Sequence, residues 1–369
     1  AYLVGRLWSR QTMRQLRTQR RLVNRAFSGE DIPVELHVAN DGWLPVAWVE
    51  MHDSLPVDLI SPPNYRRVLS LRPHESRRFS YTLTCRKRGY YVIGPMTWRT
   101  GDLLGLAPQL AGQQEAEYII VYPRVLPLQR LGLPTRSPLA SIPAPAPLFE
   151  DPTRVIGVRG YQRGDSPRRI HWTASASTGT LLVKRYQPAI ARETLICLDL
   201  AQENYSFQRL HAASELAIVA AASLANHIAV REGLAVGLAT QAFDPLEERV
   251  LSFSLPPRRG RAYLMGVLEV LARAQTTTAS GPDAEGLLPL AGFLRQQGHT
   301  LSWGSTMIVI TGQETQALDD SLLYLRQQGL AVTLVLIMPP PAGDDVHSRS
   351  AALGLPVYTI WREEEVDLL

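Results

Sequence analysis

The sequence predicts a multidomain α+β protein, in which an N-terminal β-sandwich is followed by a doubly wound α/β domain. Hydrophobic residues alternate with a period of two over residues 27–123. Prolines gather in residues 124–150, and from residue 193 onward continuous apolar runs alternate with helical segments. A chain of 369 residues is also long enough to form two hydrophobic cores.

Positive charge is concentrated at the start of the chain. Residues 1–25 contain seven arginines and no acidic residue, whereas the remainder carries 31 basic and 34 acidic side chains. The overall charge therefore gives no argument for nucleic-acid binding. We expect residues 1–26 to form a helix, because arginines three or four positions apart share one helical face. The arginines with this spacing are Arg6, Arg10, Arg14, Arg17 and Arg21.

Two interpretations of this arginine face remain open. Such a face is typical of the cytoplasmic flank of a membrane helix, so we expect a juxtamembrane segment with membrane helices before Ala1. The alternative is a solvated face of a helix in a soluble protein. The given residues contain no run of eighteen apolar residues. The membrane interpretation places the domains on the cytoplasmic side of the cell membrane.

Residues 27–123 show the pattern of half-buried strands. In DIPVELHVAN every second residue from Ile32 to Val38 is apolar, and RRFSYTLTC repeats the pattern from Phe79 to Cys85. Turn-forming residues such as Gly94-Pro95 separate these segments. Short strands and frequent turns predict a β-sandwich. Cys85 and Cys197 lie in apolar contexts far apart in the sequence, which predicts two reduced core thiols.

The second half of the chain alternates apolar strands with helices. Residues 193–200 form an apolar run, and the long Ala-rich segment that follows ends at Gly233. Similar strands and helices fill the rest of residues 193–369, which predicts a parallel sheet covered on both faces. Residues 124–150 are expected to be a linker, because proline removes hydrogen-bond donors and favours extended backbone.

Residues 151–192 form a signature segment that is rich in arginine, glycine and aromatic residues. The residues that match a known pattern, in order, are Arg159, Tyr161, Gly164, Asp165, Arg169, Ile170, Trp172, Ser175, Val183 and Lys184. With these residues the segment resembles domain-of-unknown-function family fifty-eight. The resemblance implies two membrane helices, a β-rich domain and a von Willebrand factor A-like domain. It also implies a MoxR-type AAA+ ATPase as partner, and it implies no settled reaction.

The end of the first strand of the α/β domain is a candidate metal site. Asp199 occupies this place, where a von Willebrand A domain binds a divalent cation through Asp-x-Ser-x-Ser, a later Thr and a later Asp. Here Ala201 and Glu203 replace both serines, and Gly312 stands where the later Asp is expected. Residues 276–278 are three threonines of unassigned role. Because Mg²⁺ needs several oxygen ligands, we expect no metal and regard Asp199 as vestigial.

The signature segment allows three interpretations. His171 with Asp165 resembles an oriented general base, but a positioned nucleophile is not evident. Arginines interleaved with Tyr161 and Trp172 are also typical of single-strand nucleic-acid binding, although no nucleic-acid fold accompanies them. We favour a structural junction in which Trp172 fills a gap between the domains, and an arginine face including Arg168 docks an acidic protein.

These observations predict a non-catalytic, membrane-anchored scaffold or adaptor. By resemblance it works with a MoxR-type AAA+ ATPase on a client protein that the sequence does not identify. We expect no cofactor and no nucleic-acid partner, and the chain contains no Gly-x-x-x-x-Gly-Lys-[Ser/Thr] loop for ATP chemistry. The alternatives are a cell-envelope enzyme that uses Asp165 and His171, and a metal-dependent adhesion module with a degenerate site.

Overall fold

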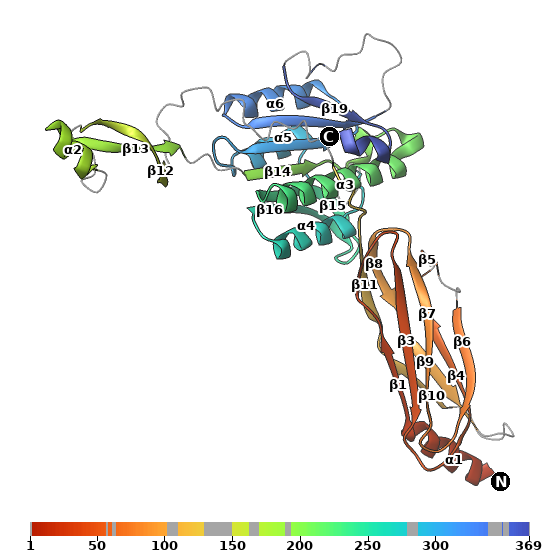
Figure 1. Ribbon diagram of the computed structural model, residues 1–369. Coiled ribbons are helices and arrows are strands. Elements are labelled where there is room, and N and C mark those ends of the chain that lie inside the picture. The colour runs from red at the N-terminus through yellow and green to blue at the C-terminus, as the bar shows by residue number, and fades with distance from the viewer. Residues whose placement is uncertain are drawn as a thin grey trace.

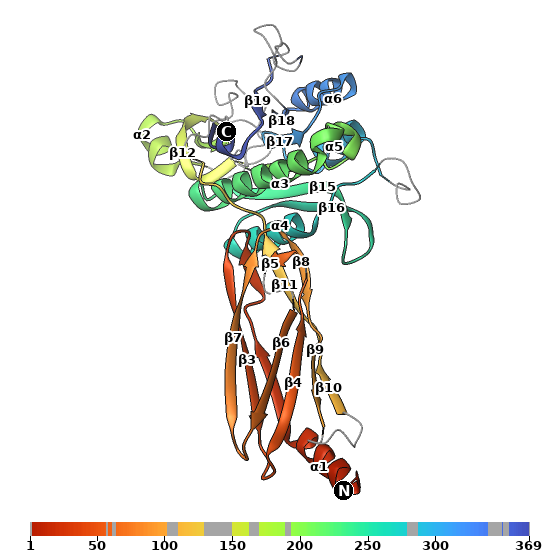
Figure 2. The ribbon, with the colours of Figure 1, turned by 90° about the vertical axis from the view of Figure 1, so that its right-hand side faces the viewer.

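The computed structural model is a mixed α+β structure with several sheets and a strand-rich N-terminal region (Figure 1). It describes residues 2–56, 58–60, 64–101, 110–128, 150–161, 170–188, 193–278, 287–338, 349 and 354–368. An elongated strand-rich region carries an α/β region at one end and the first helix at the other, and Figure 2 shows the same arrangement from the side.

The strand-rich region consists of one helix and eleven strands within the described residues. Its elements are α1 (Tyr2–Gln15), β1 (Leu16–Arg21), β2 (Arg25–Phe27), β3 (Asp31–Asn40), β4 (Val46–Ser54), β5 (Leu59–Ile60), β6 (Asn64–Leu71), β7 (Ser76–Cys85), β8 (Gly89–Ile93), β9 (Met96–Thr100), β10 (Leu110–Gln114) and β11 (Glu117–Tyr122). Two four-stranded sheets have the orders β1-β3-β7-β5 and β10-β9-β4-β6, and β2-β11-β8 form a third sheet.

One hydrophobic core is shared by these sheets. Along β3 every second side chain is buried, from Ile32 to Val38, and these residues cluster with Val49 and Met51 of β4. The alternation predicted for these strands is therefore confirmed, because the face that points inward is apolar. Cys85 is a buried free thiol in the same core, and burial raises its pKa to about 11.

The prediction of a helix through residue 26 is wrong beyond Gln15. Leu16–Arg21 is instead strand β1, which pairs antiparallel with β3. Leu16 and Arg20 are buried and Thr18 is half-buried, whereas the residues between them are exposed, an alternation with the period of two of a strand. Arg17 and Arg21 consequently leave the helical face on which Arg6, Arg10 and Arg14 lie. Pairing with a long neighbouring strand outweighs the helical preference of the leucine, arginine and glutamine residues in this segment.

The α/β region contains a six-stranded sheet and the helices that cover it. Its elements are β14 (Glu193–Leu198), α3 (Leu210–Asn226), β15 (Ala235–Asp244), β16 (Arg249–Arg258), α4 (Arg261–Arg273), α5 (Leu290–Gly298), β17 (Thr306–Thr311), α6 (Gln316–Gln327), β18 (Ala331–Ile337) and β19 (Val357–Ile360). The strand order is β16-β15-β14-β17-β18-β19, and all neighbours are parallel except β16, which is antiparallel to β15.

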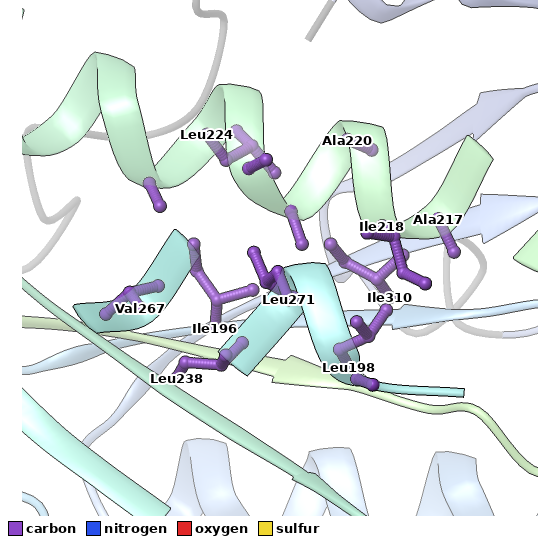
Figure 3. Packing of buried hydrophobic residues seen from close by; sticks show 14 of the residues in the cluster. Ile196, Leu198, Ala217, Ile218, Ala220, Leu224, Leu238, Val267, Leu271 and Ile310 are labelled. Carbon is purple, nitrogen blue, oxygen red and sulfur yellow. The ribbon is translucent and has the colours of Figure 1, made fainter. Parts of the chain in front are cut away.

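Helices cover both faces of this sheet. Alternate residues of β14 point to opposite sides: Ile196 and Leu198 pack against α3 and α4, whereas Leu195 and Cys197 pack against α5 and α6. Figure 3 shows the first of these layers, with Leu224 of α3 and Leu271 of α4 over the strands. The continuous apolar sequence of these strands is thus explained, because helices remove both faces of the sheet from water. Cys197 is a buried free thiol, as expected.

The helical stretch around α3, Phe207–Arg231, is long and apolar enough to cross a membrane by length and composition. The most apolar part of this stretch is largely buried in the protein, and α3 residues from Ala213 to Ala225 contribute to the core. The apolar surface of this helix is thus already covered by the sheet and by α4 (Figure 3).

Candidate functional site

Asp199 lies at the carboxyl edge of the sheet, directly after β14. Counted from β14, the strands follow the order 3-2-1-4-5-6, so β14 and β17 are the neighbours from which the chain leaves in opposite directions. The helix after β14 packs on one face, and the helix after β17 packs on the other. A crevice for ligands is expected at such a switch point. The sequence correctly located Asp199 at this edge.

The Asp199 carboxylate accepts three hydrogen bonds from the protein. Oδ1 accepts from the backbone N–H of Ala201 at 3.1 Å, and Oδ2 accepts from Asn204 Nδ2 at 2.7 Å and from Thr311 Oγ1 at 2.7 Å. Tyr205 donates its hydroxyl to the Asp199 carbonyl oxygen at 2.6 Å. Asp199 therefore ties β14 to the end of β17 and to the turn that follows β14.

Burial raises the pKa of Asp199 above its ordinary value of 3.8, because the charged form loses its contact with water. The hydrogen bonds from Thr311, Ala201 and Asn204 oppose this shift, and the nearby Glu203 adds to it. All three donors are neutral groups. Among the described residues, the donors to this carboxyl thus include no cationic side chain.

The residues around Asp199 do not resemble a complete divalent-cation site. A Cβ atom at Gly312 would clash with the Asn204 carbonyl oxygen and the Tyr205 ring, so an aspartate does not fit at this position without a shift. Of the three candidate threonines, Thr276 accepts a hydrogen bond from Gln202 at its Oγ1, whereas Thr277 lies beside the turn after Asp199 through backbone pairing. In the described part of the chain, no group of three His, Cys, Asp or Glu side chains is placed to hold a metal.

A cleft of about 400 Å³ opens beside Asp199. One wall is apolar and consists mainly of Leu287–Leu290 and Phe293, and the other carries polar groups of Asn204, Gln313 and Thr315. The lining of this cleft thus combines polar and apolar groups. Its one buried carboxylate already accepts three hydrogen bonds.

The signature segment folds into a hairpin with a short helix, which we call the signature hairpin. It comprises β12 (Glu150–Gly160), α2 (Trp172–Thr178) and β13 (Leu182–Pro188). The two strands pair antiparallel, with Arg159 opposite Val183. Ile170 and Val183 are buried beneath the helix, which ends at Gly179 with φ of 67°, a conformation that favours glycine.

Two polar residues of the motif hold this unit together. Ser175 is buried, accepts the N–H of Leu182 at 2.9 Å and donates to the His171 carbonyl oxygen at 3.0 Å. His171 caps the helix, since its Nδ1 accepts the N–H of Ala174 at 3.2 Å. These contacts give both residues a local structural role, which the sequence pattern alone did not reveal.

The described structure therefore offers no support for a His171 base. Its Nδ1 is engaged as a helix cap, and the proposed partner Asp165 lies outside the described residues. Gly164, Arg168 and Arg169 also lie outside them. Of the remaining motif residues, Arg159 donates to the Gly160 carbonyl oxygen at 3.1 Å, and Lys184 is half-buried on β13.

The prediction that Trp172 is packed between the domains is wrong. Its side chain is 67% exposed, at the first position of α2. Tyr161 and Leu181 of the same hairpin are 39% and 50% exposed. In Figures 1 and 2 the hairpin lies away from the strand-rich region. Ser175 is the buried residue of this short helix, and Trp172, at its first position, lies largely in solvent.

The contact between the two regions depends instead on Arg88. Its Nε and Nη2 bind the two carboxylate oxygens of Glu215 on α3 at 3.0 and 2.7 Å. Its Nη1 faces the carbonyl oxygens of Leu271, Ala272 and Ala274 at 2.9–3.1 Å, at the C-terminal end of α4. A cation is stabilised at a helix C-terminus. The local sequence around Arg88 carries no signal of this role.

The start of the predicted linker strengthens this junction. Tyr122 and Leu128 are buried in the core of the α/β region, and the N–H of Leu126 donates to Ser223 Oγ on α3 at 3.0 Å. Residues 124–128 therefore pack against the second region instead of spanning a gap. Residues 129–149 of the predicted linker lie outside the described residues.

Comparison with known proteins gives one distant curated relative. The "Uncharacterized protein YeaD" of Bacillus subtilis (strain 168) is 25% identical over 265 residues, which is 71% of this chain. The chain spans 59% of that protein's length.

Likenesses to solved structures are limited to small parts of the chain. The CARDB domain of the PF1109 protein from Pyrococcus furiosus has a TM-score of 0.22 at 17% identity, and covers 29% of this chain and 91% of that one. A β-glucosidase from Listeria innocua in complex with glucose has a TM-score of 0.21 at 12% identity, and covers 30% of this chain and 16% of that one. Scores this low carry no argument about function.

The family comparison agrees with the motif. The family model described as "Protein of unknown function DUF58" matches residues 157–337, from strand β12 of the signature hairpin to the end of β18. The match thus contains both the exposed hairpin and the Asp199 edge of the sheet. The resemblance to this family is therefore confirmed over residues 157–337, which match the DUF58 family.

Proposed function

We propose that this chain is a non-catalytic scaffold or adaptor at the cell membrane, and that it works with a MoxR-type AAA+ ATPase on the cytoplasmic side. In this proposal the strand-rich region is a β-sandwich and the α/β region is von Willebrand A-like. The antiparallel edge strand β16 beside an otherwise parallel sheet is compatible with that interpretation. ATP chemistry belongs to the partner.

One observation carries the proposal: the signature hairpin presents large side chains to solvent. Trp172, Tyr161 and Leu181 are exposed, whereas the polar residues Ser175 and His171 are used to build the hairpin. Exposed aromatic residues are typical anchors of protein interfaces. The motif therefore combines an internally stabilised frame with an outward apolar surface, which suits docking better than catalysis.

The proposal is tested by capture of a MoxR-type ATPase with the full chain. Because Trp172 is exposed, Trp172→Ala is expected to change the free energy of unfolding by no more than about 0.5 kcal/mol. It is expected to weaken capture at least tenfold, the effect of an interface anchor worth about 1.4 kcal/mol. Arg168→Glu tests the charged part of the same docking surface.

Phe207→Ala is the matched control, since Phe207 is 94% exposed on the α/β region and lies outside the hairpin. It is expected to leave capture unchanged. Equal capture by wild type, Trp172→Ala and Arg168→Glu would contradict the docking role. A large loss of stability in Trp172→Ala would instead return this residue to a structural role.

A further inference from the structure

Helix α1 lies at the end of the strand-rich region farthest from the α/β region (Figure 1), and exposed apolar and basic side chains gather at this end. We call this surface the tip and define it as residues 3–17, 41–45 and 72–77. Helix α1 and the loop between β3 and β4 are joined there, because Trp8 Nε1 donates to the Pro45 carbonyl oxygen at 3.2 Å. The N–H of Asp41 donates to the Gln15 carbonyl oxygen at 3.0 Å.

Four large apolar side chains of the tip face solvent. Leu3 is 71% exposed, Leu7 66%, Trp8 36% and Trp43 69%. Leu3 and Leu7 lie one turn apart on α1, and the buried residues Ser9 and Thr12 mark the opposite side of the helix. Scattered exposed hydrophobic residues are common, but a group of two leucines and two tryptophans at one end of a molecule indicates an interaction surface.

The charge of the tip is strongly positive. Its six basic residues are Arg6, Arg10, Arg14, Arg17, Arg72 and Arg77. Its two acidic residues each pair with an arginine of the tip: Asp41 with Arg17 at 2.7 Å and Glu75 with Arg77 at 2.9 Å. Arg6, Arg10 and Arg14 are exposed and make no ion pair among the described residues.

We infer that the tip binds the surface of a membrane that contains anionic lipids, with Trp43 and the α1 leucines at the lipid interface. Tryptophan is favoured at the boundary between head groups and acyl chains. Arginine side chains reach the anionic head groups while their aliphatic parts cover apolar surface. An acidic protein surface would match the charge but would not require exposed leucines and tryptophans at the same end of the molecule.

This inference extends the proposed function, because it rests on a membrane location but not on the ATPase partner. It adds a loop, residues 41–45, that is distant in sequence from the arginine helix. The elongated strand-rich region would hold the α/β region and the signature hairpin away from the bilayer (Figures 1 and 2). The tip would thereby orient the whole molecule on the membrane.

Sedimentation of the full chain with lipid vesicles tests the inference. A peptide of residues 1–30 is unsuitable, because residues 16–21 and 25–27 are strands of the folded protein. Vesicles of neutral phosphatidylcholine are compared with vesicles that also contain phosphatidylglycerol. We expect binding to the anionic vesicles that falls as salt rises, and little binding to the neutral ones.

Single variants separate the contributions of the charged and the apolar side chains of the tip to vesicle binding. Arg10→Gln and Arg14→Gln are each expected to lower the partition coefficient about fivefold, which corresponds to about 1 kcal/mol for one arginine near an anionic surface. Trp43→Ser is expected to lower the partition coefficient several-fold on the same vesicles. Brominated lipids are expected to quench the tryptophan fluorescence of the wild type more than that of Trp43→Phe.

The matched controls lie on the α/β region. Phe207→Ser removes an apolar side chain that is 94% exposed, and Arg259→Gln removes an exposed arginine. Both are expected to leave vesicle binding unchanged. Equal binding to neutral and anionic vesicles, or binding that the tip variants do not reduce, would overturn the inference. If vesicle binding fails while the ATPase is still captured, only the membrane role of the tip is rejected. If capture fails while vesicle binding is intact, only the ATPase partnership is rejected.

Discussion

Two buried carboxylates, one in each region, have different partners. Asp53 in the strand-rich region pairs with Arg20 at 2.7 Å, both side chains are fully buried, and Tyr81 donates to Asp53 at 2.6 Å. Within the described residues, the Asp199 carboxylate in the α/β region accepts hydrogen bonds from the neutral groups of Ala201, Asn204 and Thr311. Burial raises the pKa of both carboxyls.

The two carboxylates therefore differ in role: Asp53 joins strands inside a core, whereas Asp199 lies at the edge of a sheet. Arg20 also donates to the Ile93 carbonyl oxygen at 3.0 Å and lies 3.2 Å from Glu117, so the Arg20–Asp53 pair connects several strands inside one core. Asp199 instead lines a cleft, so its surroundings are less enclosed than those of Asp53. Four experiments sharpen this comparison, in order of decreasing expected effect.

Removal of the buried cation is expected to have the largest effect. Arg20→Met leaves Asp53 buried without its charge partner, and we expect a loss of about 3–5 kcal/mol in the free energy of unfolding. Denaturant unfolding measures this loss. Lys87→Met is the control, because Lys87 pairs with Asp58 at 3.4 Å on the surface, and its expected loss is below about 1 kcal/mol. Equal losses in the two variants would remove the special role of Arg20.

The Asp199 edge is expected to be less sensitive. Thr311→Val removes one hydroxyl donor from the carboxylate at nearly constant volume, and we expect a loss of about 1.5–3 kcal/mol. The control is Thr240→Val on neighbouring β15. The Thr240 hydroxyl is buried without a hydrogen-bond partner in the described structure, so this change is expected to be neutral or stabilising. A loss in Thr240→Val as large as that in Thr311→Val would contradict the assignment.

The pH dependence of stability tests the raised pKa of Asp199. The folded state holds the Asp199 proton more tightly than the unfolded state, so this group favours folding below its ordinary pKa of 3.8. That contribution is lost as the pH rises through the raised pKa. We therefore expect wild type to gain thermal stability relative to Asp199→Asn as the pH falls from neutral toward 3.8. Melting temperatures of the two proteins that stay parallel over this range would refute the shift.

Addition of a divalent metal ion is expected to have the smallest effect on the Asp199 site. The Asp199 carboxylate already accepts three hydrogen bonds, and no acidic side chain fits at Gly312 without a shift. Titration calorimetry with millimolar Mg²⁺ or Mn²⁺ is expected to give no saturable heat from this site. Saturable binding in wild type that disappears in Asp199→Asn would show that the site holds a cation despite its neutral donors.

Local sequence patterns were sufficient for much of the fold. The alternation from Ile32 to Val38 and the apolar run of β14 each identify an element, because the burial of successive side chains follows from backbone geometry. The position of Asp199 at the edge of the sheet followed in the same way. These predictions need only a single segment and the knowledge that its apolar face is buried.

The remaining features were decided by contacts between distant segments. Arginine spacing was compatible with a helix through residue 26, but pairing with β3 and the Arg20–Asp53 contact make residues 16–21 a strand. An aromatic residue in a motif can fill a junction or face solvent, and only the tertiary structure shows that Trp172 is exposed. The sequence by itself therefore determined the elements and their buried faces, which depend on local periodicity. The tertiary structure decided how Arg88 joins the regions and which motif residues remain exposed, because these depend on contacts between residues far apart in the chain.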